Sequence, residues 1–179
     1  MRAPVVVFGL GNRSRGDDAL GPLLLERLAG VLDAEGRASE IELIDDFQLQ
    51  IEHALDLADR ELALFVDAGT GTPAPFAFHA IEPASAVATH STHALPPESV
   101  LSVYRAFAGC EPPPAFVLCV RGESFELGAD LTASARGNCE AAWKRLLKLC
   151  LYPDIDTWTR LARHCRQSAD ARMRVPAQP

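Results

Sequence analysis

Short apolar runs alternate with amphipathic segments along most of the chain. An uninterrupted apolar run between polar residues is typical of a buried strand, and apolar residues that recur every three or four positions are typical of a helix packed on one side. Strands are predicted at residues 4–8, 41–45, 62–67, 76–82 and 116–120. Helices are predicted at residues 19–33, 51–59, 97–108, 131–151 and 155–165. Because strands and helices alternate, the pattern predicts an α/β fold with a mostly parallel sheet.

The strand patterns and the end of the chain also predict how the molecule is organised. Residues 4–8 (PVVVF) are apolar throughout, as in a parallel strand covered on both faces. Residues 76–82 (FAFHAIE) alternate, which indicates a half-exposed or edge strand. Residues 153–179 are rich in arginine and poor in large apolar residues. We therefore predict one domain at 1–152 and a C-terminal extension at 153–179, made of a short helix and a disordered tail.

Composition and charge narrow the classes of partner. A chain of 179 residues with 48% hydrophobic residues suits a single globular domain. Its net charge of −7 argues against nucleic acid and anionic membrane surfaces. No apolar run approaches the ~20 residues that span a bilayer, and we expect no secretory leader before the first strand. The five cysteines are widely spaced and lack a C-x-x-C pair, so we expect a cytoplasmic protein without a zinc ribbon or a disulfide framework. We also expect a monomer.

The loop after the first strand has two features that point in opposite directions. Residues 9–18 (GLGNRSRGDD) carry two of the three glycines of a dinucleotide-binding turn, and Asp45 or Asp46 could be offered as its ribose-binding carboxylate. Asp17 and Asp18, however, stand where the next helix begins, and two carboxylates there would repel a phosphate. Nucleotide binding is therefore disfavoured. Asp17 is expected to cap the helix.

Three potential metal ligands are expected at one edge of the sheet. Asp18 follows the first strand and Asp67 ends a later one, so both lie at the carboxyl edge if these strands are parallel neighbours. His93 precedes a predicted helix, with His90 three residues earlier. Taken alone, Asp67 is as consistent with a turn residue as with a ligand, and a loop histidine such as His93 is more often a surface residue than a ligand. His53 is expected at the surface or on the flank of a helix. Two carboxylates and an imidazole suit nickel, zinc, iron or manganese with open coordination positions, and ligand type does not separate these metals.

Four segments, taken in order, resemble the motifs of the [NiFe]-hydrogenase maturation endopeptidases. GLGNRSRGDDALG resembles that family's G-[IVL]-G-N-x4-D-[DE]-x2-G motif, and FVDAGTG its second acidic motif. STHALPPESVL resembles its histidine motif, and VRGESFELGADLTASA its C-terminal segment. Together they span roughly residues 4–150.

The resemblance implies a fold, an activity and a set of site residues. The fold would be a three-layer α/β/α sandwich around a twisted, mostly parallel sheet of about five strands. The activity would be one endoproteolytic cut that removes the C-terminal peptide of a hydrogenase large-subunit precursor after nickel insertion. The family's metal-binding and catalytic trio maps onto Asp18, Asp67 and His93, and the nickel would be held by the precursor. Many relatives carry D-G-G-T after the second strand, whereas here Asp45 is followed by DFQLQIE, so we expect a different hydrogenase subgroup as client.

Alternative functions and mechanisms remain open at this level. Either a metal-bound water or a water activated by a carboxylate could attack the peptide bond. No G-x-S-x-G or cysteine nucleophile motif is present, which disfavours a covalent route. FVDAGTG also resembles loosely the active-site loop of pepsin-like peptidases, but it occurs once, and the predicted helices contradict an all-β fold. A non-enzymatic nickel-binding or chaperone module in hydrogenase assembly would use the same three ligands.

Overall fold

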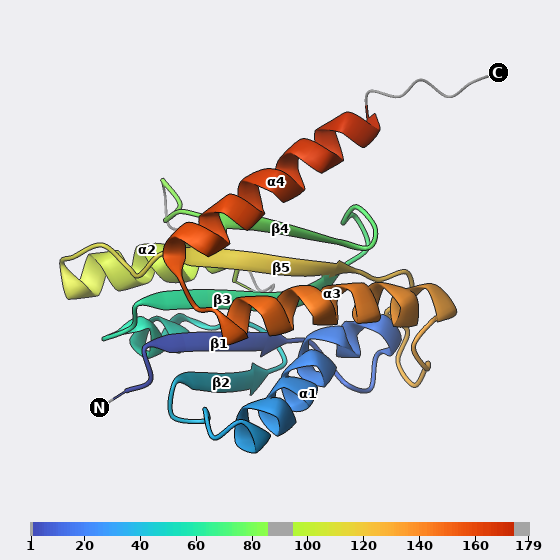
Figure 1. The fold of residues 1–179 in the computed structure, drawn as a ribbon, viewed down its shortest axis with the longest axis horizontal. Coiled ribbons are helices and arrows are strands. Elements are labelled where there is room, and N and C mark those ends of the chain that lie inside the picture. The colour runs from blue at the N-terminus through green and yellow to red at the C-terminus, as the bar shows by residue number, and fades with distance from the viewer. Residues whose placement is uncertain (1, 86–94, 174–179) are drawn as a thin grey trace.

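A five-stranded sheet forms the centre of the molecule (Figure 1). The computed structural model describes residues 2–85 and 95–173, with residues 166–173 as backbone only. The strands are β1 (Val5–Leu10), β2 (Ile41–Asp46), β3 (Leu62–Gly69), β4 (Phe76–Ile81) and β5 (Ala115–Arg121). The helices are η1 (Gly16–Ala19), α1 (Leu20–Ala34), η2 (Ile51–Leu57), α2 (Pro97–Ala108), α3 (Ala133–Leu151) and α4 (Ile155–Met173), of which η1 and η2 are 3-10 helices.

The strand order is β2-β1-β3-β5-β4, and all neighbours are parallel except β4, which runs antiparallel to β5. The predicted α/β fold with a mostly parallel sheet is thus confirmed. β4 lies at the sheet edge, as its alternating pattern predicts. β1 lies between two parallel neighbours and is covered on both faces, which explains why it is buried at every position.

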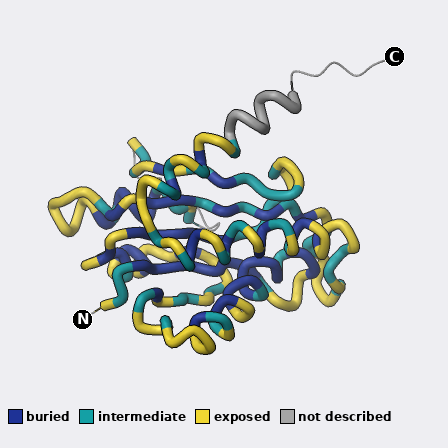
Figure 2. The backbone as a smooth tube through the Cα atoms, viewed as in Figure 1, coloured by how far each residue is buried: buried dark blue, intermediate teal, exposed yellow. Residues whose placement is uncertain are grey.

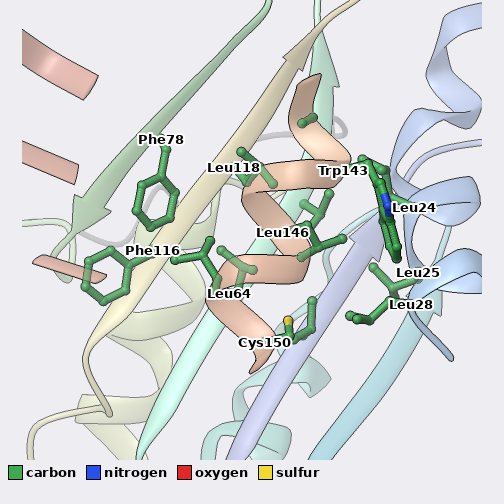
Figure 3. Packing of buried hydrophobic residues seen from close by; sticks show 14 of the residues in the cluster. Leu24, Leu25, Leu28, Leu64, Phe78, Phe116, Leu118, Trp143, Leu146 and Cys150 are labelled. Carbon is green, nitrogen blue, oxygen red and sulfur yellow. The ribbon is translucent and has the colours of Figure 1, made fainter. Parts of the chain in front are cut away.

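Two apolar layers separate the sheet from the helices on its two faces. One face packs against α1, α3 and α4, and the other against η2 and α2, which completes the three-layer sandwich. Figure 2 shows the buried strands enclosed by helices whose outer surfaces are exposed. In the first layer Trp143 and Leu146 of α3 meet Leu24 and Leu28 of α1 above the sheet (Figure 3). Residues one position apart along each strand therefore serve opposite layers.

Helix α4 begins where the sequence predicts but continues to Met173 instead of ending near residue 165. Its Trp158 is completely buried, and its ring lies edge-on to that of Phe116 with 5.3 Å between the ring centroids. The indole Nε1–H donates a hydrogen bond to the carbonyl of Leu149 at 3.1 Å. This side chain joins the start of the extension to the sheet and to α3. The division at residue 152 stays a prediction. No helix in the described part of the chain has the length and apolarity to cross a membrane.

Candidate functional site

Asp18 and Asp67 line one cavity at the carboxyl edge of the sheet. Because β1 and β3 are parallel neighbours, the turn that follows β1 and the end of β3 reach the same edge. The cavity has a volume of about 370 Å³. Its walls are Leu10, Gly11, Asp18, Phe47, Gln48, Leu49, Asp67, Ala68, Leu95, Pro96 and Pro97. The predicted placement of the two carboxylates at one edge is confirmed.

Asp67 is a half-buried carboxylate near the end of β3. Its Oδ1 accepts a hydrogen bond from the backbone N–H of Ala68 at 2.7 Å. Burial raises the pKa of Asp67 to about 6, because the charged form loses water; the hydrogen bond from Ala68 opposes this and the negative charge of Asp18 adds to it. This carboxyl group can therefore gain or lose a proton close to neutral pH.

Asp18 is held by a turn that only glycine permits. Its Oδ2 accepts a hydrogen bond from the backbone N–H of Asn12 at 2.9 Å. Gly11 has φ +131°, and a Cβ there would lie 1.9 Å from the carbonyl oxygen of Asp18. The glycine of the sequence motif thus lets the chain fold back against η1, which gives it a steric role and not a phosphate-binding one.

The prediction that Asp17 caps the helix is wrong. The side chain caps neither η1 nor α1, whose N-caps are Arg15 and Ala19. Asp17 is instead completely buried, and its carboxylate accepts hydrogen bonds from Glu123, Ser124 and Thr132. Loss of water on burial would raise the pKa of Asp17, but these hydrogen bonds to the ionised carboxylate outweigh it, and the pKa is lowered.

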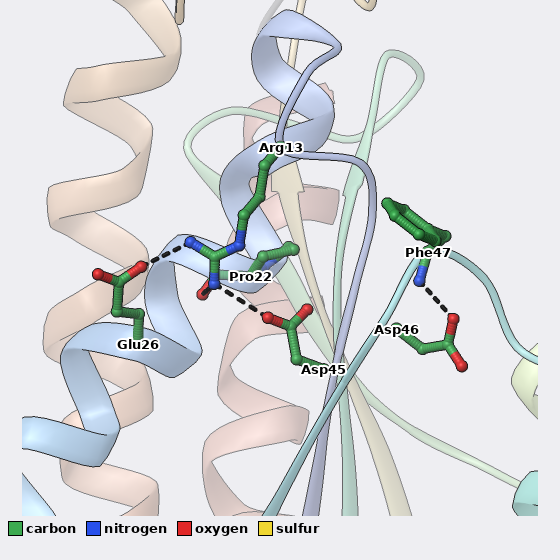
Figure 4. A network of polar contacts seen from close by, with 6 residues as sticks. All are labelled: Arg13, Pro22, Glu26, Asp45, Asp46 and Phe47. Atoms are coloured by element: carbon green, nitrogen blue, oxygen red, sulfur yellow. Dashed lines mark hydrogen bonds and ion pairs between the residues drawn. The ribbon is translucent and has the colours of Figure 1, made fainter.

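The loop that follows β1 is also held to α1 and β2 by the side chain of Arg13. Arg13 donates to Glu26 of α1 at 2.5 Å, to Asp45 of β2 at 2.9 Å and to the carbonyl of Pro22 at 3.1 Å (Figure 4). Asp45, one of the two candidate ribose-binding residues, is thus paired with the arginine of the loop itself. This pairing adds to the case against a dinucleotide site.

One cavity wall depends on a histidine whose role the sequence pattern did not indicate. His53, expected at the surface or on the flank of a helix, is only 8% exposed, and its ring lies edge-on to that of Phe8 with 5.6 Å between the ring centroids. Its Nδ1 accepts from the backbone N–H of Gln50 at 2.9 Å, and its Nε2 lies 3.3 Å from Asp46 Oδ2. Asp46 Oδ1 in turn accepts from the N–H of Phe47 at 2.6 Å (Figure 4). His53 and Asp46 therefore fix both ends of the wall segment 47–49.

A cysteine beside Asp67 was also missed, and strand register is the signal that could have found it. Cys119 of β5 stands opposite Asp67, so both side chains face the same side of the sheet. Its thiol lies 2.9 Å from Thr72 Oγ1. Burial raises the pKa of the thiol, and the charge of Asp67 raises it further against the effect of Thr72. A thiol held neutral in this way is a poor nucleophile.

The third predicted ligand, His93, lies outside the described residues, as does His90. The next residues that the structure describes, Leu95 and Pro96, belong to the cavity wall, and the N–H of Leu95 donates to the carbonyl of Leu49 at 3.4 Å. Within residues 2–85 and 95–165, no three His, Cys, Asp or Glu side chains are grouped closely enough to hold a metal ion. The three-ligand site stays a prediction.

Comparison of the sequence with protein-family models and with curated proteins finds no match. Solved structures do match. The hydrogenase maturating endopeptidase HybD from E. coli superposes with a TM-score of 0.60 and 26% identity, over 83% of this chain and 91% of that one. The solution structure of an endopeptidase from Escherichia coli gives 0.59 and 27%, over 83% and 91% of the two chains. The [NiFe] hydrogenase maturation protease HycI from Thermococcus kodakarensis gives 0.62 and 22%, over 83% and 92%, and so shares the fold. The chain is thus similar to hydrogenase maturation endopeptidases in the order of its sequence motifs and in its fold.

Proposed function

We propose that this protein is an endopeptidase that removes the C-terminal peptide of a [NiFe]-hydrogenase large-subunit precursor after nickel has been inserted. The observation that carries the proposal is the pair of carboxylates, Asp18 and Asp67, in one cavity at the carboxyl edge of a fold shared with maturation proteases. A cavity of about 370 Å³ is too small for a folded domain but admits a few side chains of an extended segment.

In this proposal the nickel ion belongs to the substrate. Asp18, Asp67 and His93 contact the ion that the precursor already holds through its thiolates. A precursor without nickel lacks the cation that offsets the two carboxylates, and it binds poorly. Cleavage is then conditional on a loaded metal centre, which is selection through a required partner.

The chemistry requires a water molecule to attack the scissile carbonyl and a group to accept its proton. Asp67 suits the acceptor role in its ionised form. Burial raises the pKa of Asp67 to about 6 when no cation is near, and the nickel ion of a loaded precursor would favour the ionised carboxylate that accepts the proton. We assign the enzyme to the aspartic, metal-dependent type, with Cys119 outside the reaction.

The choice of client depends in this proposal on the wall segment 47–49. It follows Asp45 and Asp46 where many relatives carry D-G-G-T, and it lines the cavity with Phe47, Gln48 and Leu49. Bulky side chains replace glycines there, so the precursor segment that enters must differ in shape. We infer a client from a different hydrogenase subgroup.

The decisive experiment mixes the purified protein with nickel-loaded and nickel-free forms of candidate precursors and measures the mass of each large subunit. We expect loss of a C-terminal fragment from the loaded form alone. Asp18→Asn, Asp67→Asn and His93→Ala should each abolish it, whereas Asp33→Asn, an exposed position on α1 with the same charge change, should not. Full cleavage by all three site variants would contradict the proposal. Nickel uptake with an unchanged precursor mass would instead support the non-enzymatic nickel-binding module.

A further inference from the structure

We propose that Asp17 is the positioning residue of the site, because its buried carboxylate joins the turn that carries Asp18 to residues 122–132. We call this connection the Asp17 joint, formed by residues 14–17 on one side and 122–132 on the other. The proposal rests on the proposed function for its effect on cleavage. Its structural part stands on the contacts alone.

Both carboxylate oxygens of Asp17 accept hydrogen bonds within the joint. Oδ2 accepts from the N–H of Glu123 at 2.7 Å, the N–H of Ser124 at 3.1 Å and the hydroxyl of Thr132 at 2.9 Å. Oδ1 accepts from the N–H of Thr132 at 2.8 Å. An ionised carboxylate offers acceptors only, and here every neighbour is a donor. The side chain has no exposed surface, so these donors take the place of water.

Backbone contacts close the joint around this side chain. The N–H of Gly16 donates to Ala129 O at 3.1 Å, that of Asp17 to Ser124 O at 2.9 Å, and that of Gly128 to Ser14 O at 2.7 Å. Two stretches more than a hundred residues apart in the chain are therefore joined by backbone hydrogen bonds as well as by the Asp17 side chain.

The two segments approach as closely as glycine allows. A Cβ on Gly122 would lie 3.0 Å from Asp17 Cβ and 2.6 Å from the ring of Phe125. A Cβ on Gly16, whose φ is +54°, would lie 2.6 Å from Ser124 O. The two segments of the Asp17 joint are therefore too closely packed to shift relative to each other, and such packing can fix the position of a neighbouring side chain. It also explains the glycine at the start of the C-terminal motif, which the two-carboxylate site leaves without a role.

Asp18 receives its position from the joint because it is the next residue of the same short turn. η1 spans only Gly16–Ala19, so fixing Asp17 fixes the backbone of Asp18. Asp17 points into the joint while Asp18 lines the cavity. The hydrogen bond from Asn12 N–H then sets the orientation of the Asp18 carboxylate. The two acidic residues thus have different roles: Asp17 holds the turn, and Asp18 faces the substrate.

A purely structural role for Asp17 makes a different prediction. Thr132 is the N-cap of α3, its Oγ1 accepting from Ala135 N–H at 3.1 Å while donating to Asp17. If Asp17 served only to stabilise α3, its loss would lower stability everywhere and leave the chemistry of folded molecules intact. The test must therefore distinguish a change in the position of Asp18 from a loss of stability of the whole protein.

The test compares Asp17→Asn with Asp154→Asn in the full-length protein. Asparagine keeps the shape of Asp17 but turns an amide NH₂ towards donors. Asp154 accepts from Thr157 N–H at 2.7 Å at the start of α4, far from the site. Its variant makes the same change of a hydrogen-bonded carboxylate to an amide, whose oxygen can keep that bond. Steady-state cleavage of nickel-loaded precursor and hydrogen exchange of the amides of residues 10–18 are measured, with β5 amides as the reference for global opening.

We expect Asp17→Asn to lower kcat by about 100-fold with little change in KM, since a displacement of about 1 Å costs that much. The rate of hydrogen exchange at the Asn12 amide should rise about tenfold more than the rates at the β5 amides. Thr132→Val should act in the same direction and Thr132→Ser should restore both values, which keeps the test informative if Asp17→Asn does not fold. Asp154→Asn should change neither.

Two results would overturn the proposal: wild-type kcat in Asp17→Asn, or faster exchange at Asn12 that matches the change in β5. If wild-type protein cleaves no precursor, the proposed function fails, and the exchange measurement still decides whether the Asp17 joint holds the Asp18 turn.

Discussion

Replacing Asp67 by asparagine is expected to stabilise the protein at neutral and higher pH. The folded protein holds a proton on Asp67 more tightly than the unfolded chain does, because burial raises the pKa from 3.8 to about 6. Stability that this group contributes is fully present below pH 3.8 and is lost as the pH rises through about 6. Asparagine removes the charge and keeps an oxygen for the hydrogen bond from Ala68 N–H.

The size of the effect follows from the pKa. Above pH 6 the ionised carboxylate costs about 3 kcal/mol, taken as an upper value because the side chain is partly exposed. At pH 4.5, where much of the folded population is already neutral at this position, the advantage of Asp67→Asn falls to about 1 kcal/mol. For a chain of this length the difference at pH 8 corresponds to a rise in Tm of up to about 10 °C.

The assay is urea unfolding at pH 4.5 and pH 8 in the presence of a chelator, so that no metal ion neutralises the site. Asp33→Asn on the exposed face of α1 makes the same change in net charge and should show no comparable gain. A gain of the same size at both pH values, or a loss of stability at pH 8, would refute the argument that burial of the charged form is the cause.

Three further substitutions test the frame around the site. Trp158→Ala removes a fully buried ring and its hydrogen bond to Leu149 O, and should lower the free energy of unfolding by about 3–5 kcal/mol; a change below 1 kcal/mol in urea unfolding would mean that α4 is not part of the folded core. Gly11→Ala places a methyl group 1.9 Å from Asp18 O at φ +131°, so we expect several kcal/mol of destabilisation or an altered turn, seen as shifted amide resonances of residues 10–18; an unchanged spectrum and Tm would contradict the steric reading. Arg13→Ala breaks two ion pairs that are about half exposed to solvent, and should change the free energy of unfolding by less than about 1 kcal/mol. A loss above about 2 kcal/mol would contradict this expectation.

The sheet and the position of its two carboxylates could be predicted because the signals are local. β1 and β3 are apolar runs that no other element explains, and in parallel α/β sheets the chain leaves each strand at the same edge. These two facts place Asp18 and Asp67 together before any contact is known. Their roles, and that of His93, stay predictions.

The features that escaped prediction depend on contacts between distant parts of the chain. Asp17 has the sequence environment of a helix cap, and only the donors of residues 123–132 give it another use. His53 looks like an exposed helix residue until Phe8 and Asp46 pack against it. The extent of α4 was underestimated for another reason: large apolar residues thin out after Leu161, yet the alanines, arginines and glutamine beyond it favour helix by themselves.

The Asp17 joint also sets the order in which the site can mature during synthesis. β1 and β3 are complete once residue 69 has emerged, so both cavity carboxylates exist early. The last donor to Asp17 belongs to Thr132, 115 residues further along, and at ordinary translation rates it appears roughly 6–20 s after Asp17. Until then the turn that carries Asp18 lacks its partner. A nascent or truncated chain that ends before residue 122 has both carboxylates but not their fixed geometry, so competence arrives only once the chain has been made through residue 132.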